Sequence, residues 1–239
     1  MLKTIRPNAK QVYMFVLLLS LLPFLLEGVS FPKHLFFFIV IASSLLPVIV
    51  WFVKRRTFIL NDLFGMLLVF RVLTDLSCVL TEILLHNSTP TFFFSLPING
   101  ILILQLFHKH LQTPFSKKFF RMSLLFIAGL FLYQLMFVSM FSIDPMMNLL
   151  TYSLIVLSGI SVIYQSKDRL FLNTIVFPLC AYYAPLIFYS LFEIQIHSSR
   201  ELFDQVYVWS ATLTLALNLF FCRTVWLKQP LFNSEDQSK

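Results

Sequence analysis

Residues 70–82, FRVLTDLSCVLTE, place an arginine, an aspartate and a glutamate within an otherwise apolar stretch. On an α-helix, positions i, i+4, i+7 and i+11 share a face. Arg71, Asp75, Cys78 and Glu82 therefore line up as one polar stripe. We call this stripe the seam. A guanidinium and a carboxylate one turn apart would form an ion pair, or would hold an anion at Arg71 and a proton or cation at Asp75.

The composition explains why such a seam is costly. The chain is 58% hydrophobic, has 29 Phe and is only 12% charged, whereas soluble domains are about a quarter charged. Continuous apolar runs recur along its length, as expected for membrane-spanning helices and not for the alternating strands of a barrel. A charge at the bilayer centre costs roughly 2.5–3.5 kcal/mol on insertion scales. The seam should therefore face protein or a wet cavity.

The sequence predicts an all-α, polytopic transmembrane helix bundle that forms a single domain over 1–239. We expect eight helices, near 11–29, 35–53, 59–85, 91–107, 119–141, 147–165, 171–194 and 201–222. Cys78, Cys180 and Cys222 fall within these spans and are expected to be packing residues, not disulfides.

The basic residues predict the orientation, because Lys and Arg gather in cytoplasmic loops. Of the 18 Lys and Arg residues, only Lys33 and Arg200 fall on the other side, and Arg71 lies inside a span. Both termini are therefore predicted to be cytoplasmic. The alternative is a cleaved signal peptide over residues 1–30, with Gly28-Val29-Ser30 as the cleavage site.

Internal matches favour a 4+4 tandem repeat, with repeats at 1–114 and 115–229 and a polar tail at 230–239. KRRTFILN (54–61) resembles KDRLFLN (167–173), EILLH (82–86) resembles EIQIH (193–197), and LQLF (104–107) resembles LNLF (217–220). Chance similarity in Leu/Phe-rich sequence is the alternative. At the position that matches the seam, the second half carries Tyr182, Tyr183 and Pro185.

Two later helices supply further candidate site residues. Pro178 and Pro185 each remove a backbone donor and favour a kink around Tyr182. In the last helix, Ser210, Thr214 and Asn218 share a face. The predicted ligand or ion site combines these two helices with the seam: Arg71, Asp75, Glu82, Tyr182 and Asn218. The alternative is that these side chains only hold helices together.

A weaker pattern is a metal or proton-sensing site at the outer rim. Glu82/His86 and Glu193/His197 both have E-x-x-x-H spacing, which puts a carboxylate and an imidazole on one helix face. Rim residues of these types more often meet water and headgroups. No cofactor is expected.

Enzyme motifs are not found in the sequence. Ser158-Gly159-Ile160-Ser161 lacks the final glycine and the nearby base of a serine hydrolase. Catalysis stays open but is disfavoured, and the short loops give no surface for nucleic acid.

HNSTPTFFFSLPINGILILQLFHKH, FPLCAYYAPLIFYSLFEIQIH and VWSATLTLALNLFF resemble stretches of a group of uncharacterised bacterial multi-pass membrane proteins. The resemblance covers roughly the last six helices. It implies location in the bacterial inner membrane and carries no activity or site residue.

We therefore expect a non-enzymatic inner-membrane protein, a sensory or accessory subunit that binds a small ligand or another membrane protein through the seam. The alternative is a compact proton- or cation-coupled transporter of a small solute. In both cases we expect the chain to contact the lipid bilayer.

Overall fold

The computed structural model describes residues 33–55, 59, 62–86, 89–141, 144–195 and 200–226. Across these ranges the chain is helical and contains no strand. The helix predicted over 11–29, the cleavage alternative and the tail at 230–239 lie outside the described residues. At the other seven predicted positions the described residues are helical, with shifted ends.

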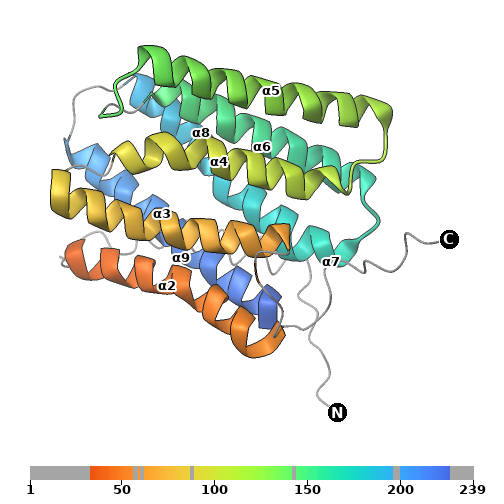
Figure 1. The fold of residues 1–239 in the computed structure, drawn as a ribbon, viewed down its shortest axis with the longest axis horizontal. Coiled ribbons are helices and arrows are strands. Elements are labelled where there is room, and N and C mark those ends of the chain that lie inside the picture. Colours follow the sequence, from red (N-terminus) through yellow and green to blue (C-terminus); the bar gives the residue numbers. More distant parts are fainter. Residues whose placement is uncertain are drawn as a thin grey trace.

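The elements follow one another along the chain with short connections (Figure 1). They are α2 (Lys33–Arg55), α3 (Leu63–Leu85), α4 (Thr89–His108), α5 (Pro114–Phe137), α6 (Pro145–Gln165), α7 (Arg169–Phe171), the π-helical segment η2 (Leu172–Val176), α8 (Phe177–Gln195) and α9 (Arg200–Trp226).

Local capping chemistry sets several of these boundaries. Asp62 precedes α3 and accepts a hydrogen bond from the Phe64 amide at 2.8 Å, so the helix predicted from residue 59 begins at 63. The helix predicted over 119–141 begins earlier, because Thr113 caps it and Pro114 fits its first turn. Asp144 and Pro145 start α6 in the same way.

Five described segments are long and apolar enough to cross a membrane. They are Leu63–Leu85, Thr89–His108, Pro114–Phe137, Pro145–Gln165 and Arg169–Leu191. Together they make the chain an integral membrane helix bundle.

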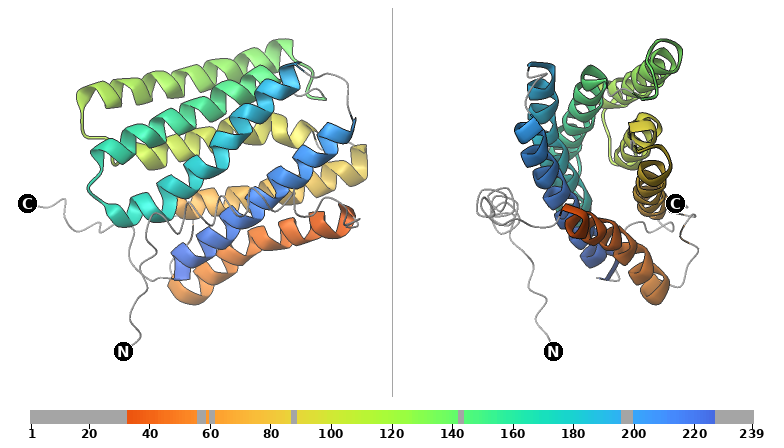
Figure 2. Two further views of the ribbon diagram at one scale, coloured as in Figure 1. Left: turned by 180° about the vertical axis from the view of Figure 1, so that it is seen from behind. Right: turned by 90° about the vertical axis from the view of Figure 1, so that its left-hand side faces the viewer.

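Six of the helices form a closed ring of neighbours. Contacts run from α2 to α3, α4, α6, α8 and α9, and back to α2, while α5 packs outside against α4 and α6. In Figure 1, α8 and α9 pass behind α3 and α4, and Figure 2 brings them to the front. The core between them holds large buried side chains such as Trp51, Phe64, Phe107 and Phe221.

A glycine permits one of the closest approaches in the ring. A Cβ added at Gly159 of α6 would collide with the Cys180 sulfur of α8 and would lie 3.4 Å from the Phe107 ring of α4. Gly159 therefore lets α6 pack tightly against α8.

Candidate functional site

The three seam residues whose side chains the structure describes lie toward the bundle, as their spacing predicts. Arg71 and Cys78 are buried and Asp75 is partly buried, whereas Leu73 and Leu76 on other faces of α3 are exposed. At 1.5 Å per residue, Arg71 and Asp75 lie roughly 12 and 18 Å from the start of a helix roughly 34 Å long. The two charged groups are therefore near the middle of the span.

The Arg71 guanidinium lies between aromatic rings of two other helices. Its carbon is 5.4 Å from the Tyr182 ring centroid in α8 and 5.9 Å from that of Phe221 in α9, both within cation–π range. Phe221 in turn meets Phe64 edge to face at 5.2 Å. Arg71 is only 8% exposed, and its buried Nε has no hydrogen-bond partner.

Asp75 also has a buried atom without a partner, Oδ2. Arg71 and the Ser44 side chain of α2 both lie near enough to act on its carboxyl. The Ser44 hydroxyl also lies 2.8 Å from the Ile41 carbonyl, so its single proton is shared between this carbonyl and the carboxyl. The carboxylate is therefore left with unused acceptor capacity.

The ion pair that the i,i+4 spacing allows is not formed. No nitrogen of Arg71 lies within 4.0 Å of an Asp75 oxygen, although the two charges interact electrostatically. The reason is the direction of the Arg71 side chain, which extends over the Tyr182 and Phe221 rings of the facing helices.

Tyr182 and Asn218 both join the predicted neighbourhood, but with different roles. Tyr182 packs against Arg71, and its hydroxyl is 3.2 Å from the Thr214 hydroxyl of α9. Asn218 is 2% exposed and donates to the Ser43 hydroxyl of α2 at 2.9 Å. Asn218 therefore holds α9 to α2, and Tyr182 is the one that shapes the surroundings of the guanidinium.

The backbone before Pro178 departs from a regular α-helix. The chain is π-helical over Leu172–Val176, immediately upstream, and the Thr174 carbonyl accepts a hydrogen bond from the Thr224 hydroxyl of α9 at 3.2 Å. Because proline has no N–H, carbonyls in the preceding turn need other donors. The Thr224 hydroxyl also lies 2.9 Å from the Phe220 carbonyl of its own helix, so its single proton is shared between the two carbonyls.

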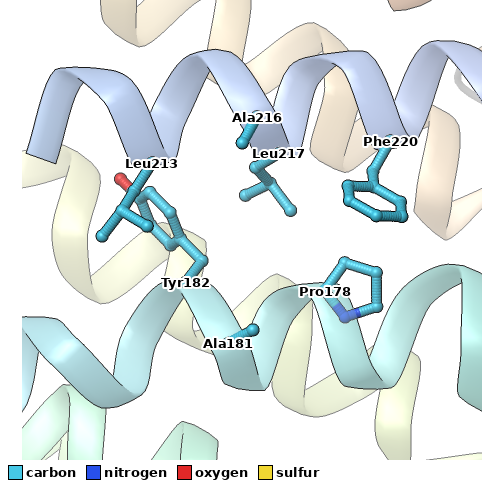
Figure 3. A pocket seen from close by; sticks show the side chains of 7 residues that line it. All are labelled: Pro178, Ala181, Tyr182, Leu213, Ala216, Leu217 and Phe220. Carbon is cyan, nitrogen blue, oxygen red and sulfur yellow. The ribbon is translucent and has the colours of Figure 1, made fainter. Parts of the chain in front are cut away.

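A small groove lined in part by Tyr182 lies between α8 and α9 (Figure 3). Its volume is about 20 Å³, and its lining is apolar apart from the tyrosine: Pro178, Ala181, Tyr182, Leu213, Ala216, Leu217 and Phe220. A space of this size holds about one water-sized group.

The outer-rim hypothesis gains no support. The side chains of Glu82 and Glu193, and the whole of His197, lie outside what the structure describes. His86 is exposed and ends α3 in a left-handed conformation with φ of 51°. Among the described residues, no three His, Cys, Asp or Glu side chains are grouped to hold a metal ion.

Ser43, Ser44 and Phe221 belong to the site but were not predicted from the sequence. The two serines are the one weak signal, as adjacent hydroxyls within an apolar run, whereas nothing distinguishes Phe221 from the other phenylalanines. No protein-family model, curated protein or solved structure matches the chain. The site is therefore interpreted from its own geometry.

Proposed function

We propose that this chain is a non-enzymatic membrane protein that binds a small polar ligand at Arg71 and Asp75, as a sensory or accessory subunit of the bacterial inner membrane. The observation that carries the proposal is the pair of unpartnered buried atoms, Arg71 Nε and Asp75 Oδ2, one helical turn apart in mid-span. One is a donor and the other an acceptor, on groups of opposite charge.

The energetics favour an occupant over a purely structural role. A buried charged group that lacks hydrogen bonds costs several kcal/mol, and a packing pair would be expected to close into direct contact. Here the guanidinium is supported by aromatic rings, and the carboxylate keeps a free oxygen. A ligand with both an acceptor and a donor would satisfy both groups.

The size of the ligand follows from the packing. The groove beside Tyr182 has a volume of about 20 Å³, and Tyr182 also contacts the guanidinium, so we propose a ligand group of few atoms. Large drug-like or nucleotide ligands do not fit this arrangement.

The predicted orientation, with both termini cytoplasmic, is supported by contacts at one end of the bundle. Lys54 of α2 lies 3.7 Å from the centre of the Trp226 ring of α9. At the same end, Gln165 of α6 accepts from the Thr113 amide before α5 at 3.3 Å. The basic helix ends therefore gather together, as the positive-inside rule expects.

A second candidate is a proton- or cation-coupled transporter in which Asp75 carries the ion. The internal sequence matches favour it, because KRRTFILN (54–61) with KDRLFLN (167–173) would exchange α3 with α8 as equivalent helices of two repeats. Parallel repeats with a site at their interface are a common transporter plan. The Arg71–Tyr182 contact joins α3 to α8, the exchanged pair.

The test compares wild type, Arg71→Gln and Asp75→Asn, purified in mild detergent, by intact-mass analysis of co-purified molecules and by thermal unfolding. Gln105→Leu is the matched control, because Gln105 is also an amide-bearing polar residue in a span but is exposed on α4. We expect both site variants to stay folded and to lose a small molecule that wild type and Gln105→Leu retain.

The proposal fails if wild type carries no ligand and both site variants unfold at much lower temperature, which would make the seam interhelical packing. Flux in liposomes decides between the two candidates. Solute- or proton-driven flux that Asp75→Asn abolishes supports the transporter, and binding without flux supports the accessory subunit.

A further inference from the structure

Three exposed cations lie close together near the start of α5. They are Lys117, Lys118 and Arg121. On an α-helix, residues three and four apart are neighbours, about 5–6 Å from each other, so Arg121 lies beside both lysines. Like charges at these spacings repel and destabilise a helix. The cluster therefore favours an anion that lies between the side chains.

The described part of the chain supplies no such anion. The sequence has no aspartate or glutamate between Glu82 and Asp144, and the first turn of α5 contains no acidic residue. Among the described residues, no carboxylate lies within 4.0 Å of any of the three cations. Lys54, by contrast, lies over the Trp226 ring at 3.7 Å. The start of α5 is thus a positive surface that an external anion would neutralise.

An apolar strip continues from this cluster along the outer side of α5. Met122, Leu125 and Gly129 follow Lys118 at i+4, i+7 and i+11, so all four share a face. Met122 and Leu125 are 58% and 67% exposed, and a Cβ added at Gly129 would meet nothing within 4 Å. α5 lies on the outside of the bundle (Figure 2). The strip is therefore open to the hydrocarbon of the bilayer.

The length of the strip matches one acyl chain. At 1.5 Å per residue, the rise from Lys118 to Gly129 is roughly 16 Å. This is about half of the roughly 30 Å of hydrocarbon in a bilayer, and so about one leaflet. Positive charge at one end and an apolar strip of this length below it follow the order of an anionic headgroup and its chain.

We infer that the start of α5 binds an anionic phospholipid, with the headgroup phosphate at Lys118 and Arg121 and an acyl chain along Met122, Leu125 and Gly129. A second copy does not fit this face. Two copies have the same orientation in a membrane, so a contact through the strip would place Lys118 of one copy against Lys118 of the other. The inference is independent of any ligand at Arg71.

The experiment measures lipid binding to the full chain in detergent by native mass spectrometry. Phosphatidylglycerol is the anionic probe and phosphatidylcholine is the zwitterionic one. The test variant is Lys118→Gln with Arg121→Gln. The matched control is Lys167→Gln with Arg169→Gln, which removes the same charge from two exposed cations that flank Asp168. Thermal unfolding with inorganic phosphate alone distinguishes a lipid headgroup from a free anion.

We expect wild type and the control variant to prefer phosphatidylglycerol, and the test variant to lose roughly tenfold or more of this preference. Because salt screens exposed charges, about 0.5 M NaCl should reduce the preference of wild type, a measurement that needs no substitution.

Four results would overturn the inference. The first is equal binding of the two lipids by wild type, or a preference that salt leaves unchanged. The second is an equal loss in the control variant. The third is stabilisation by inorganic phosphate as large as that by phosphatidylglycerol, which would assign the cations to a free anion. The fourth is a dimer that becomes more abundant in the test variant, which would assign the face to a second copy.

Discussion

The Arg71 guanidinium of α3 lies over the Tyr182 ring of α8, with its carbon 5.4 Å from the ring centroid. This contact joins two helices that are not direct neighbours in the ring. It also turns the guanidinium away from Asp75, which leaves a donor and an acceptor unused. The electrostatics of the site thus depend on one tyrosine.

Two substitutions at Tyr182 should separate the stability contributed by its hydroxyl from that contributed by its ring. Tyr182→Phe keeps the ring over Arg71 and loses the contact with the Thr214 hydroxyl, so we expect a stability loss of about 0.5–1 kcal/mol. Tyr182→Leu also removes the ring quadrupole, which should cost a further amount of about 0.5–2 kcal/mol. Unfolding in detergent, monitored by tryptophan fluorescence, measures both.

The Arg71→Gln background is the control for this interpretation. Without the guanidinium, the additional loss caused by Tyr182→Leu over Tyr182→Phe should shrink. An equal loss in both backgrounds would show that the ring acts only by packing.

The sequence predicted much of this arrangement because its signals are local. Helical spacing is enough to put Arg71 and Asp75 on one inward face, and the Asp144-Pro145 step marks the start of α6. The direction of a long side chain is different, because it depends on what the facing helix presents. Nothing in FRVLTDLS predicts that Tyr182 and Phe221 would draw the guanidinium away from Asp75.

Because α6 packs closely on α8, we expect alanine substitutions at Gly159 and at Gly129 to have different effects on the stability of the protein. Gly159→Ala should destabilise the protein by about 1–3 kcal/mol, because the new methyl group meets the Cys180 sulfur and the Phe107 ring. Gly129→Ala on α5 has nothing within 4 Å and should be neutral or gain up to about 1 kcal/mol from helix propensity.

Thermal unfolding of the two glycine variants side by side gives the comparison. Adding Cys180→Ala should recover part of the Gly159→Ala loss, since it removes the atom that the new methyl group meets. Equal midpoints for Gly159→Ala and Gly129→Ala would contradict the tight α6–α8 contact.

His110, in the connection between α4 and α5, predicts a pH dependence. Its ring stacks on Phe171 at 3.6 Å between centroids, and burial there lowers its pKa below the usual 6.5. Lys109 also lowers this pKa, and Asp168 partly opposes both. As pH falls through about 6.5, the unfolded chain takes up the proton first. Stability should therefore fall on acidification.

The His110→Gln variant tests this, because glutamine does not titrate in this range. We expect the unfolding midpoint of wild type to fall between pH 7.5 and 5.5, a range chosen to span the usual histidine pKa. The fall should be smaller in His110→Gln. A fall of the same size in both would assign the pH response to other groups.

The π-helical segment shows another limit of sequence reasoning. The presence of Pro178 predicts a disturbed helix. The sequence does not tell which helix provides hydrogen-bond donors for the carbonyls that precede this proline. The hydroxyl nearest the Thr174 carbonyl, that of Thr224 in α9, lies 50 residues away in the chain, and its position depends on how the ring closes. The Asn218–Ser43 bond is equally non-local.

The most direct test of the ligand site is a double-mutant cycle of Arg71→Gln and Asp75→Asn, measured as unfolding free energy in ligand-stripped protein. Because no ion pair joins the two side chains, we predict a coupling energy below about 1 kcal/mol. A coupling of about 2–3 kcal/mol, the upper part of the range for residues in direct contact, would contradict the account and make the seam a packing device.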